Sequence, residues 1–473
     1  MVRDVDRLQR FFDIQKRALA DTPAPDLAER LSRLSRLKNM LIENRERFRK
    51  ALATDFGNHH RWMSDMMEAG SVIGRIRHFE TELPQWLAPR PVVLEEAHGS
   101  SRAEILIVPK GVCGVIAPWN FPIECALVMV TDMFAAGNSV IIKPSELAPS
   151  CAQLLDEIVA ENFAPEVLAV VQGGPELAYA FASLPWDHLT YTGSSRVGRL
   201  VAAAAAQNLT PLTLELGGKN PAVFAPDGVT DDAIACFLSF RVLKAGQVCT
   251  SPDYALVPQD RMEDWIAIAT SAWRAAYPKH VGNPDATGII NVHHYGRILG
   301  YISEARAKGA RVIVLNEDRP DATLRQIPMT LIVDPPAELA CMSEEIFGPV
   351  VPVVPYRSID DAMRRINAEP TPLAAYIATS DDALARRFVQ TVRAGGAGVN
   401  TFGLQGSHPA LPFGGFGASG YGCHSGQAGF LNYAHQKSVF HAGKDSIVHL
   451  ALAAPLSPLC GAVVDAMFRP DAA

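Results

Sequence analysis

The sequence has few cysteines, and none is paired by its spacing. The eight stand singly, with no CxxC pair and no regular ladder, at positions 113, 125, 151, 236, 249, 341, 423 and 460. A disulfide framework and a zinc ribbon both need closely spaced cysteines, so the sequence argues against both. Isolated cysteines are typical of a reducing compartment. We therefore expect a cytoplasmic protein without a metal site.

An excess of one charge is also missing. The 43 basic and 50 acidic residues leave a net charge of -7, so nothing indicates a nucleic-acid partner. Hydrophobic residues make up 48% and charged residues 20% of the 473 positions, which excludes a disordered chain and indicates a globular one. At this length roughly three domains are expected.

Long hydrophobic runs are absent as well. The most apolar stretch, Ile447–Val464, is interrupted by His449, Pro455 and Pro458. A membrane-spanning helix needs about 20 unbroken apolar residues, so no membrane span is expected. We expect this tail to pack on its own protein or on a partner subunit, with peripheral contact to a bilayer as the alternative. The charged segment Met1–Arg10 lacks the apolar core of a signal peptide.

The chain shows two successive patterns of expected secondary structure. Leucines at positions 27, 31, 34, 37 and 41 recur at helical spacing, and the first hundred residues read as helices. From Arg102 onward, short β-rich runs such as Val112–Ala117 and Ser139–Ile142 alternate with helical stretches. Such alternation predicts parallel sheets with crossover helices. The glycine-rich segment Phe413–Gly422 is expected to be a loop rather than a strand.

The common phosphate-binding loops are missing, since no GxxxxGK[ST] occurs and no GxGxxG follows the early strands. Two other features stand in their place. Lys143 and Glu146 follow a strand, where α/β sheets bind ligands, although taken alone a surface ion pair explains them better. Residues 190–198 read as a strand, a turn at Gly193 and a helix capped by Ser194. The helix N-terminus suits a phosphate, and a plain helix cap explains the pattern about as well.

Three polar residues are candidates for catalysis. Glu215 ends an apolar strand, and burial there raises a carboxyl pKa toward that of a general base, unless donors of the following Gly-Gly turn satisfy it. Cys249 lies in a polar turn, where reactive thiolates occur, although most free cysteines are inert. Asn120 stands between two prolines and can stabilise an oxyanion or only form the turn. Two adjacent acids, the second being Glu345, can bind a sugar diol or form a solvated turn.

In combination and order these motifs closely resemble those of the aldehyde dehydrogenase superfamily. The resemblance runs from about residue 25 to about residue 440. It rests on PWNFP (118–122), KPSE (143–146), TGS-x3-G (192–198), LELGGK (214–219), GQxC (246–249), EEIFGP (344–349) and PFGG-x-G-x-SG (412–420). The ending GCHSGQAGF (422–430) is similar to the class-3 branch, and within it to bacterial coniferyl aldehyde dehydrogenases.

The resemblance implies a reaction and its residues. Cys249 would be the nucleophile, Glu215 the base that activates water, and Asn120 with the Cys249 backbone N–H the oxyanion hole. An aldehyde would become a carboxylic acid through a thiohemiacetal and a thioester, with a nicotinamide cofactor as hydride acceptor. A coenzyme A-acylating enzyme, disfavoured because Glu215 is present, and a catalytically silent NAD-binding protein remain as alternatives.

The resemblance also implies which residues hold the cofactor. Lys143 and Glu146 would hold the adenosine ribose, and Glu345 the nicotinamide ribose. The full expected set is Trp119, Lys143, Pro144, Ser145, Glu146, Gly193, Ser194, Gly198, Leu216, Gly217, Glu345 and Phe347. Because the Glu146 carboxylate repels a 2′-phosphate, NAD is expected to be preferred, although class-3 relatives with this glutamate also use NADP.

The expected substrate pocket is apolar and partly aromatic. Its candidate walls are Phe121, Trp62, Met63, Met66, Thr401 and Phe402. No cationic cluster accompanies them, which disfavours a substrate with a second carboxylate. An aromatic aldehyde such as coniferyl aldehyde, or a medium- to long-chain aliphatic aldehyde, is expected instead. For Met66 and its neighbour Met67 the alternative is ordinary helix core.

The sequence departs from the family pattern at two places. Position 244 is lysine where the family usually has asparagine, and its ammonium either lowers the pKa of the Cys249 thiol or points to solvent. Cys423 and His424 replace a tyrosine-containing pattern that lies, in the family, near the pocket mouth and the dimer interface. This second departure bears on substrate choice.

The family fold implied is α/β, with two open, twisted, parallel-type domains and a small β oligomerisation arm. The expected divisions are 1–215 for the NAD(P)-binding domain, with 91–109 contributing to the arm, 216–408 for the catalytic domain, and 409–473 for the return segment, the C-terminal strand and the tail. Such an arm would extend a neighbour's sheet, so a homodimer is expected.

Overall fold

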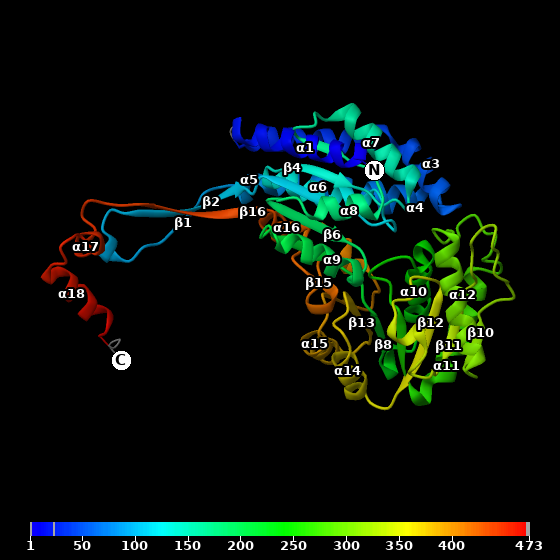
Figure 1. Ribbon diagram of the computed structural model, residues 1–473. Coiled ribbons are helices and arrows are strands. Elements are labelled where there is room, and N and C mark those ends of the chain that lie inside the picture. Colours follow the sequence, from blue (N-terminus) through cyan, green and yellow to red (C-terminus); the bar gives the residue numbers. More distant parts are fainter. Residues whose placement is uncertain (1, 22–23, 470–473) are drawn as a thin grey trace.

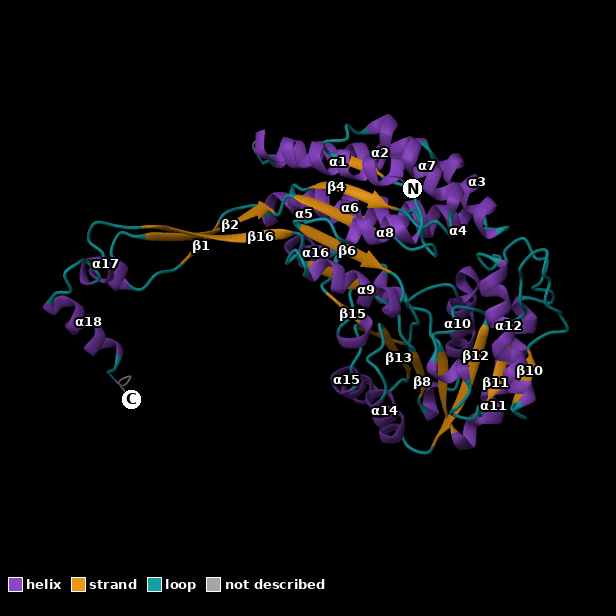
Figure 2. Cartoon of the chain, viewed as in Figure 1, coloured by secondary structure: helices purple, strands orange, loops and turns teal. Residues whose placement is uncertain are grey.

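The computed structural model describes residues 2–21 and 24–469. Figure 1 shows two α/β lobes one above the other, with a thin arm that projects from the upper lobe and carries the C-terminal helices. Within the described residues the strands form sheets of six, seven and three strands. Figure 2 shows that helices flank the sheet in each lobe, as the alternation of strands and helices predicted.

The N-terminal residues are helical because their apolar side chains share one face. Leu34, Leu37 and Leu41 are completely buried, as is Leu52 on the next helix. The elements are α1 (Val2–Asp21), α2 (Leu27–Glu43), α3 (Arg45–Phe56), α4 (Arg61–Met63), a π-helical turn η1 (Ser64–Gly70) and α5 (Ser71–Trp86). These helices pack on the upper lobe and share its core.

The upper lobe is built on the sheet β15-β7-β6-β3-β4-β5. Its strands are β3 (Val112–Ile116), β4 (Ser139–Lys143), β5 (Leu168–Val170), β6 (His188–Thr192), β7 (Leu212–Glu215) and β15 (Gly420–Tyr421). The connecting helices are α6 (Glu124–Ala136), α7 (Pro149–Asn162), α8 (Pro175–Ala182) and α9 (Ser195–Ala206). The strand order reverses at β3, and such a reversal opens a ligand crevice at the carboxyl ends of the strands.

The lower lobe is built on the sheet β10-β11-β12-β9-β8-β13-β14. Its strands are β8 (Pro221–Phe224), β9 (Tyr254–Pro258), β10 (Arg311–Val314), β11 (Thr330–Val333), β12 (Val350–Tyr356), β13 (Ala374–Ala378) and β14 (Gly396–Val399). Its helices are α10 (Asp231–Val242), α11 (Met262–Ala276), α12 (Val292–Ala307), α13 (Ala340–Ser343), α14 (Ile359–Ala368) and α15 (Asp382–Thr391). All of its strand pairs are parallel except the edge pair β10–β11.

The glycine-rich segment 413–422 is not entirely a loop, which corrects the expectation from its composition. Gly420 and Tyr421 pair antiparallel with Glu215 and Leu214 and form the edge strand β15. A Cβ at Gly420 would lie 1.9 Å from the Leu214 carbonyl oxygen, and its φ is +122°. Glycine is therefore what allows this segment to approach the strand that ends at Glu215.

The arm consists of β1 (Arg90–Val92), β2 (Arg102–Pro109) and β16 (Ala434–His441), which pair antiparallel in that order. Helix α16 (Gly426–Asn432) precedes β16, and α17 (Ile447–Ala451) and α18 (Pro458–Met467) follow at the tip of the arm (Figure 1). Most of β16 and the apolar side chains of the tip are exposed. Among the described residues, none of the helices combines the length and the apolar character that crossing a bilayer requires.

Candidate functional site

Asn120 follows the central strand of the upper sheet. It lies in the turn between β3 and α6 and is 5% exposed. Its side-chain Nδ2 donates a hydrogen bond to the carbonyl oxygen of Gln247, at 3.1 Å. Gln247 precedes Cys249 by two residues, so this bond joins the upper lobe to the loop that carries the candidate nucleophile. The amide is therefore held at a fixed place beside that loop.

Glu215 ends β7 and is almost completely buried. Neither of its carboxyl oxygens has a hydrogen-bond partner among the described residues. Burial raises the pKa of this carboxyl well above its usual value, and the Arg75 guanidinium opposes the shift. The turn does not satisfy Glu215 through its backbone donors, which was the alternative to a general base. A buried carboxyl with a raised pKa and free lone pairs can accept a proton near neutral pH.

Cys249 lies in a strained loop between α10 and β9. Lys244, Ala245 and Gly246 have φ values of +52°, +57° and +76°, all in the left-handed region. A non-glycine residue there costs about 1–3 kcal/mol and persists only where its surroundings over-determine it. Asn220 provides part of that support, because its Nδ2 donates to the carbonyl oxygens of Cys249, at 2.7 Å, and of Ser251.

The surroundings of Cys249 disfavour a resting thiolate. Burial raises the pKa of the thiol, and the carboxylates of Glu345, Glu124 and Glu215 add to the increase. Lys244 does not point to solvent, which corrects one of the two sequence-based expectations for it. Its ammonium is buried and donates to the Glu68 carboxylate. Reaction of the thiol therefore requires a nearby proton acceptor.

The residues expected to hold the adenosine end lie together at the carboxyl ends of β4 and β6. Lys143 is 2% exposed, and its Nζ donates to Oε2 of Glu146, at 2.9 Å; the Glu146 side chain is 42% exposed. The pair is therefore not an ordinary surface ion pair, because its lysine is buried and only its glutamate is accessible to solvent. Pro144 is buried and Ser145 half-buried between the two. A fixed ammonium beside an accessible carboxylate fits a ribose diol.

The turn after β6 has the predicted order of strand, turn and helix. Ser194 caps α9, and its hydroxyl accepts the N–H of Val197. A Cβ at Gly193 would lie 2.3 Å from the Tyr191 hydroxyl, and one at Gly198 would lie 2.8 Å from the Leu216 side chain. A side chain at either position would force Tyr191 or Leu216 to shift. The free N–H groups at the start of α9 can receive a phosphate.

The residues expected at the nicotinamide end come from three segments and meet. A Cβ at Gly217 would lie 2.2 Å from the Glu345 carboxylate, so this glycine leaves the room that Glu345 occupies. Burial, and then the Asp253 carboxylate, raise the pKa of Glu345 to about 8. Phe347 has a φ of +52°, and its ring lies 5.5 Å from that of Trp119. This cradle, with the buried Leu216 beside Gly217, fits a nicotinamide riboside.

The expected substrate walls are only partly brought together. Trp62 and Met63 line a cavity of 330 Å³ between the N-terminal helices and the lower lobe. Met66 is 61% exposed, so it is neither helix core nor a wall of that cavity. Phe121 is buried against Lys244. Thr401 is half-buried, and its hydroxyl has no partner within the part of the chain that is described.

Phe402 is not a pocket wall, which corrects the sequence-based expectation. It is 1% exposed and packs on Phe224, Phe237 and Tyr376 in the core of the lower lobe. Only the packing of these rings places Phe402 in the core, and the local sequence around Thr401 does not indicate it.

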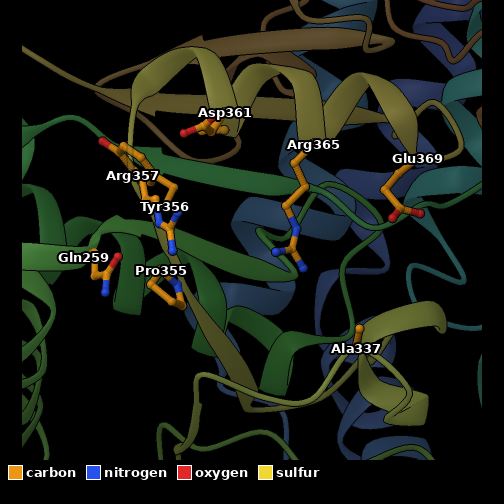
Figure 3. A pocket seen from close by; sticks show the side chains of 9 residues that line it. Gln259, Ala337, Pro355, Tyr356, Arg357, Asp361, Arg365 and Glu369 are labelled. Carbon is orange, nitrogen blue, oxygen red and sulfur yellow. The ribbon is translucent and has the colours of Figure 1, made fainter.

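A second cavity lies elsewhere, in the lower lobe. It has a volume of 690 Å³ and lies at the end of β12 beside α14. Figure 3 shows Arg365 and Glu369 reaching over it from the helix, opposite Pro355 and Gln259. None of the expected catalytic or cofactor residues is among those that line it. Size alone therefore does not mark the candidate site.

Sequence reasoning missed the buried ions that hold the site together. Arg241 is 1% exposed and donates to the carbonyl oxygens of Gly348 and Val350. It also forms an ion pair with Asp253, which accepts the N–H of Ile346. These bonds fix the loop of Glu345 next to the loop of Cys249. The one available signal was the placement of Arg241 at the end of an apolar helix.

The departure at Cys423 and His424 lies inside the protein. His424 is 5% exposed, and its Nδ1 lies 2.7 Å from Nη1 of Arg75 and 2.9 Å from Oγ of Ser425. Burial lowers the pKa of His424 well below its usual value, so the ring is neutral. In the chain as described, this segment therefore makes internal contacts with α5 and α6.

Comparison with known proteins gives one family. A family model described as "Aldehyde dehydrogenase family" matches residues 4–439. A probable coniferyl aldehyde dehydrogenase of Caulobacter vibrioides is 39% identical over 93% of this chain and 92% of its own length. A coniferyl aldehyde dehydrogenase of Pseudomonas sp. is 36% identical over 95% and 94%. A "dimeric NADP-preferring" aldehyde dehydrogenase of Rattus norvegicus is 32% identical over 86% and 89%.

Solved structures agree in fold. The substrate-bound AldH of Staphylococcus aureus superimposes with a TM-score of 0.91 at 29% identity, covering 98% of this chain and 99% of that one. An aldehyde dehydrogenase of Mycobacterium tuberculosis in complex with NAD+ gives a TM-score of 0.81 at 29% identity, covering 90% and 88%. The α/β fold expected from the sequence is confirmed.

Proposed function

This chain belongs to the aldehyde dehydrogenase family, an NAD(P)-dependent enzyme family, and we propose that it oxidises its aldehyde through a thioester on Cys249 that Glu215 hydrolyses. The observation that carries the proposal is the state of Glu215. Its carboxyl is buried, has a raised pKa and no hydrogen-bond partner among the described residues, and is close enough to Cys249 to raise the pKa of the thiol.

Each proton and charge in the proposed reaction has a named destination. The Cys249 thiol gives its proton to a water molecule, and the thiolate attacks the carbonyl carbon, so that the carbonyl electron pair moves to oxygen. The Asn120 amide and the Cys249 backbone N–H donate to that oxyanion. NAD(P) supplies the hydride acceptor when bound, and loss of hydride leaves a thioester. Glu215 then takes a proton from water, the hydroxide attacks the thioester, and the C–S bond breaks to give the carboxylic acid.

The cofactor contacts follow from the two cradles. Lys143 and Glu146, with Pro144 and Ser145 between them, would hold the adenosine ribose, and the start of α9 the pyrophosphate. Trp119, Leu216, Gly217, Glu345 and Phe347 would hold the nicotinamide riboside. The family uses NAD(P). We propose that NAD is preferred, because the accessible Glu146 carboxylate, bonded on one side to Lys143, repels a 2′-phosphate.

Replacing Asn120 by alanine is expected to slow hydride transfer by about 100-fold or more, because one oxyanion donor is lost. The pre-steady-state rate of NADH formation measures this step directly. Asn162→Ala, which removes a side-chain hydrogen bond at the end of α7, is the matched control and should leave the rate unchanged. An Asn120→Ala rate equal to that of the wild type would remove Asn120 from the oxyanion hole.

The proposed substrate is an aromatic or medium- to long-chain aliphatic aldehyde. Support comes from the coniferyl aldehyde dehydrogenases among the relatives. The expected walls Trp62 and Met63 line a cavity that also contains Lys244, five residues before Cys249. We expect kcat/KM for coniferyl aldehyde, benzaldehydes and long aliphatic aldehydes to exceed that for short semialdehydes by roughly tenfold or more. A substrate panel with both cofactors measures this, and a preference for short semialdehydes would contradict it.

The proposed assembly is a homodimer through the arm. The strands β2 and β16 project from the body with most of β16 exposed, and the helices at the tip expose apolar side chains such as Leu452, Leu456 and Phe468. A second copy can bury both features, which a single chain leaves open. We also propose a reducing, cytoplasmic location, because the Cys249 thiol must stay reduced to act.

A further inference from the structure

We propose that Lys244 is a positioning residue that holds the oxyanion hole together, an inference that rests on the proposed function of Asn120 and Cys249. Its ammonium donates to the Glu68 carboxylate and to the main-chain carbonyl oxygen of Asn120. The residue is 6% exposed, so both contacts are made inside the protein.

The ammonium of Lys244 is enclosed by aromatic rings as well as by oxygens. Its Nζ lies 4.1 Å from the ring centre of Phe121 and 4.6 Å from that of Phe56. A cation held over two ring faces and bonded to a carboxylate and a carbonyl has little freedom to move. The side chain is thus a rigid connection rather than a solvated charge.

Glu68 extends this connection into the upper lobe. It lies in the π-helical turn η1, and its Oε2 accepts the backbone N–H groups of Ile123 and Glu124 at the start of α6. The Asn120 turn is therefore held at its own carbonyl by Lys244 and just after it by Glu68. Two buried charges that satisfy each other and also fix backbone groups give a defined geometry, and removal of one leaves the other unpaired.

The other end of the connection is the strained loop. Lys244 begins the left-handed run that leads to Cys249, and its carbonyl oxygen accepts Nε2 of Gln247, at 2.9 Å. The main-chain carbonyl oxygen of Gln247 in turn accepts a hydrogen bond from the side-chain amide of Asn120. Lys244 thus bonds the backbone of Asn120 directly and the side chain of Asn120 through Gln247. If this connection is lost, the amide is free to move relative to the Cys249 thiol.

A double-mutant cycle between Lys244→Met and Asn120→Ala tests the inference. Asn120→Ala keeps the main-chain carbonyl that Lys244 binds, so each change removes one part of the arrangement. We expect Lys244→Met to lower the rate constant of the NADH burst by about 100-fold, as a displacement near 1 Å does, with KM for NAD unchanged. In the Asn120→Ala background the same substitution should change the rate constant by less than about threefold, because the amide it positions is gone.

The readout separates positioning from stability. A purely structural role lowers the burst amplitude, which counts folded sites, and leaves the rate constant per site unchanged. The double variant Glu68→Gln, Lys244→Met leaves no buried charge unpaired and should keep the slow burst with a restored amplitude. Lys38→Met, which breaks the ion pair with Glu80 on the N-terminal helices, is the matched control and should leave the rate constant unchanged.

Two results would overturn the inference: additive effects in the cycle, or a wild-type burst rate constant in Lys244→Met or in the double variant. A failure of the proposed function has a different appearance. If Asn120→Ala alone keeps the wild-type rate constant, the oxyanion hole itself is wrongly assigned, whatever Lys244→Met does.

Discussion

Cys249→Ser is expected to abolish aldehyde-dependent NADH formation, with a loss of at least about 10⁴-fold, while NAD binding is retained. A serine hydroxyl is a far weaker nucleophile than a thiol at neutral pH. The buried, acidic surroundings that raise the pKa of Cys249 would raise that of a hydroxyl further. The loop itself should keep its form, because Asn220 bonds the main-chain carbonyl of residue 249 and not its side chain.

Two measurements check this prediction. Steady-state and burst NADH formation report the chemistry, and calorimetric titration with NAD reports binding. Cys236→Ser is the matched control, since Cys236 is half-buried on α10 outside the candidate site, and its rate should stay within about twofold of wild type. Turnover that persists in Cys249→Ser would exclude Cys249 as the nucleophile.

Glu215→Gln is expected to slow steady-state turnover by about 10²- to 10⁴-fold and to slow the NADH burst much less. Glutamine fills the same buried space at the end of β7 but cannot accept a proton from water, so the thioester accumulates. The steady-state rate then falls below the burst rate, and one equivalent of NADH per site forms before turnover slows. Glu80→Gln, on the N-terminal helices, serves as the control.

The pH dependence gives an independent check on Glu215. Its pKa is raised by burial, and a general base acts only when deprotonated, so the rate of thioester hydrolysis should increase as pH rises through this elevated pKa. That increase lies above the usual range of a carboxyl group and should vanish in Glu215→Gln. An unchanged steady-state rate in the variant, or turnover that requires coenzyme A, would remove Glu215 as the base.

Local context made three residues candidates for catalysis, and the family resemblance gave each of them a proposed role. Asn120 stands between prolines, Glu215 ends an apolar strand before two glycines, and Cys249 lies in a polar turn rather than on a helix face. The turn at Gly193 and the cap at Ser194 were likewise predicted, since strand ends and helix caps depend on neighbouring residues.

Errors arose where a residue's neighbours are distant in the chain. Thr401 and Phe402 were both expected to line the substrate pocket, but the packing of the lower lobe places Phe402 in its core. The local sequence around Gly420 predicts a loop, but its pairing with Glu215, far away in the chain, places it in an edge strand. For Lys244 the sequence left two interpretations, a solvated ammonium or one that lowers the pKa of the Cys249 thiol, and neither identified its buried partner Glu68, which precedes it by 176 residues.

The sequence by itself determined the family and most of the alternation of strands and helices, and it offered the side chains proposed for the chemistry, because these depend on local pattern and residue type. Only the tertiary structure decided which groups are charged and which are held. Burial raises the pKa of Glu215 and of Cys249, and the Glu68–Lys244 pair joins three segments around Asn120. Desolvation and ion pairing depend on what surrounds a group in space, and no local pattern specifies that.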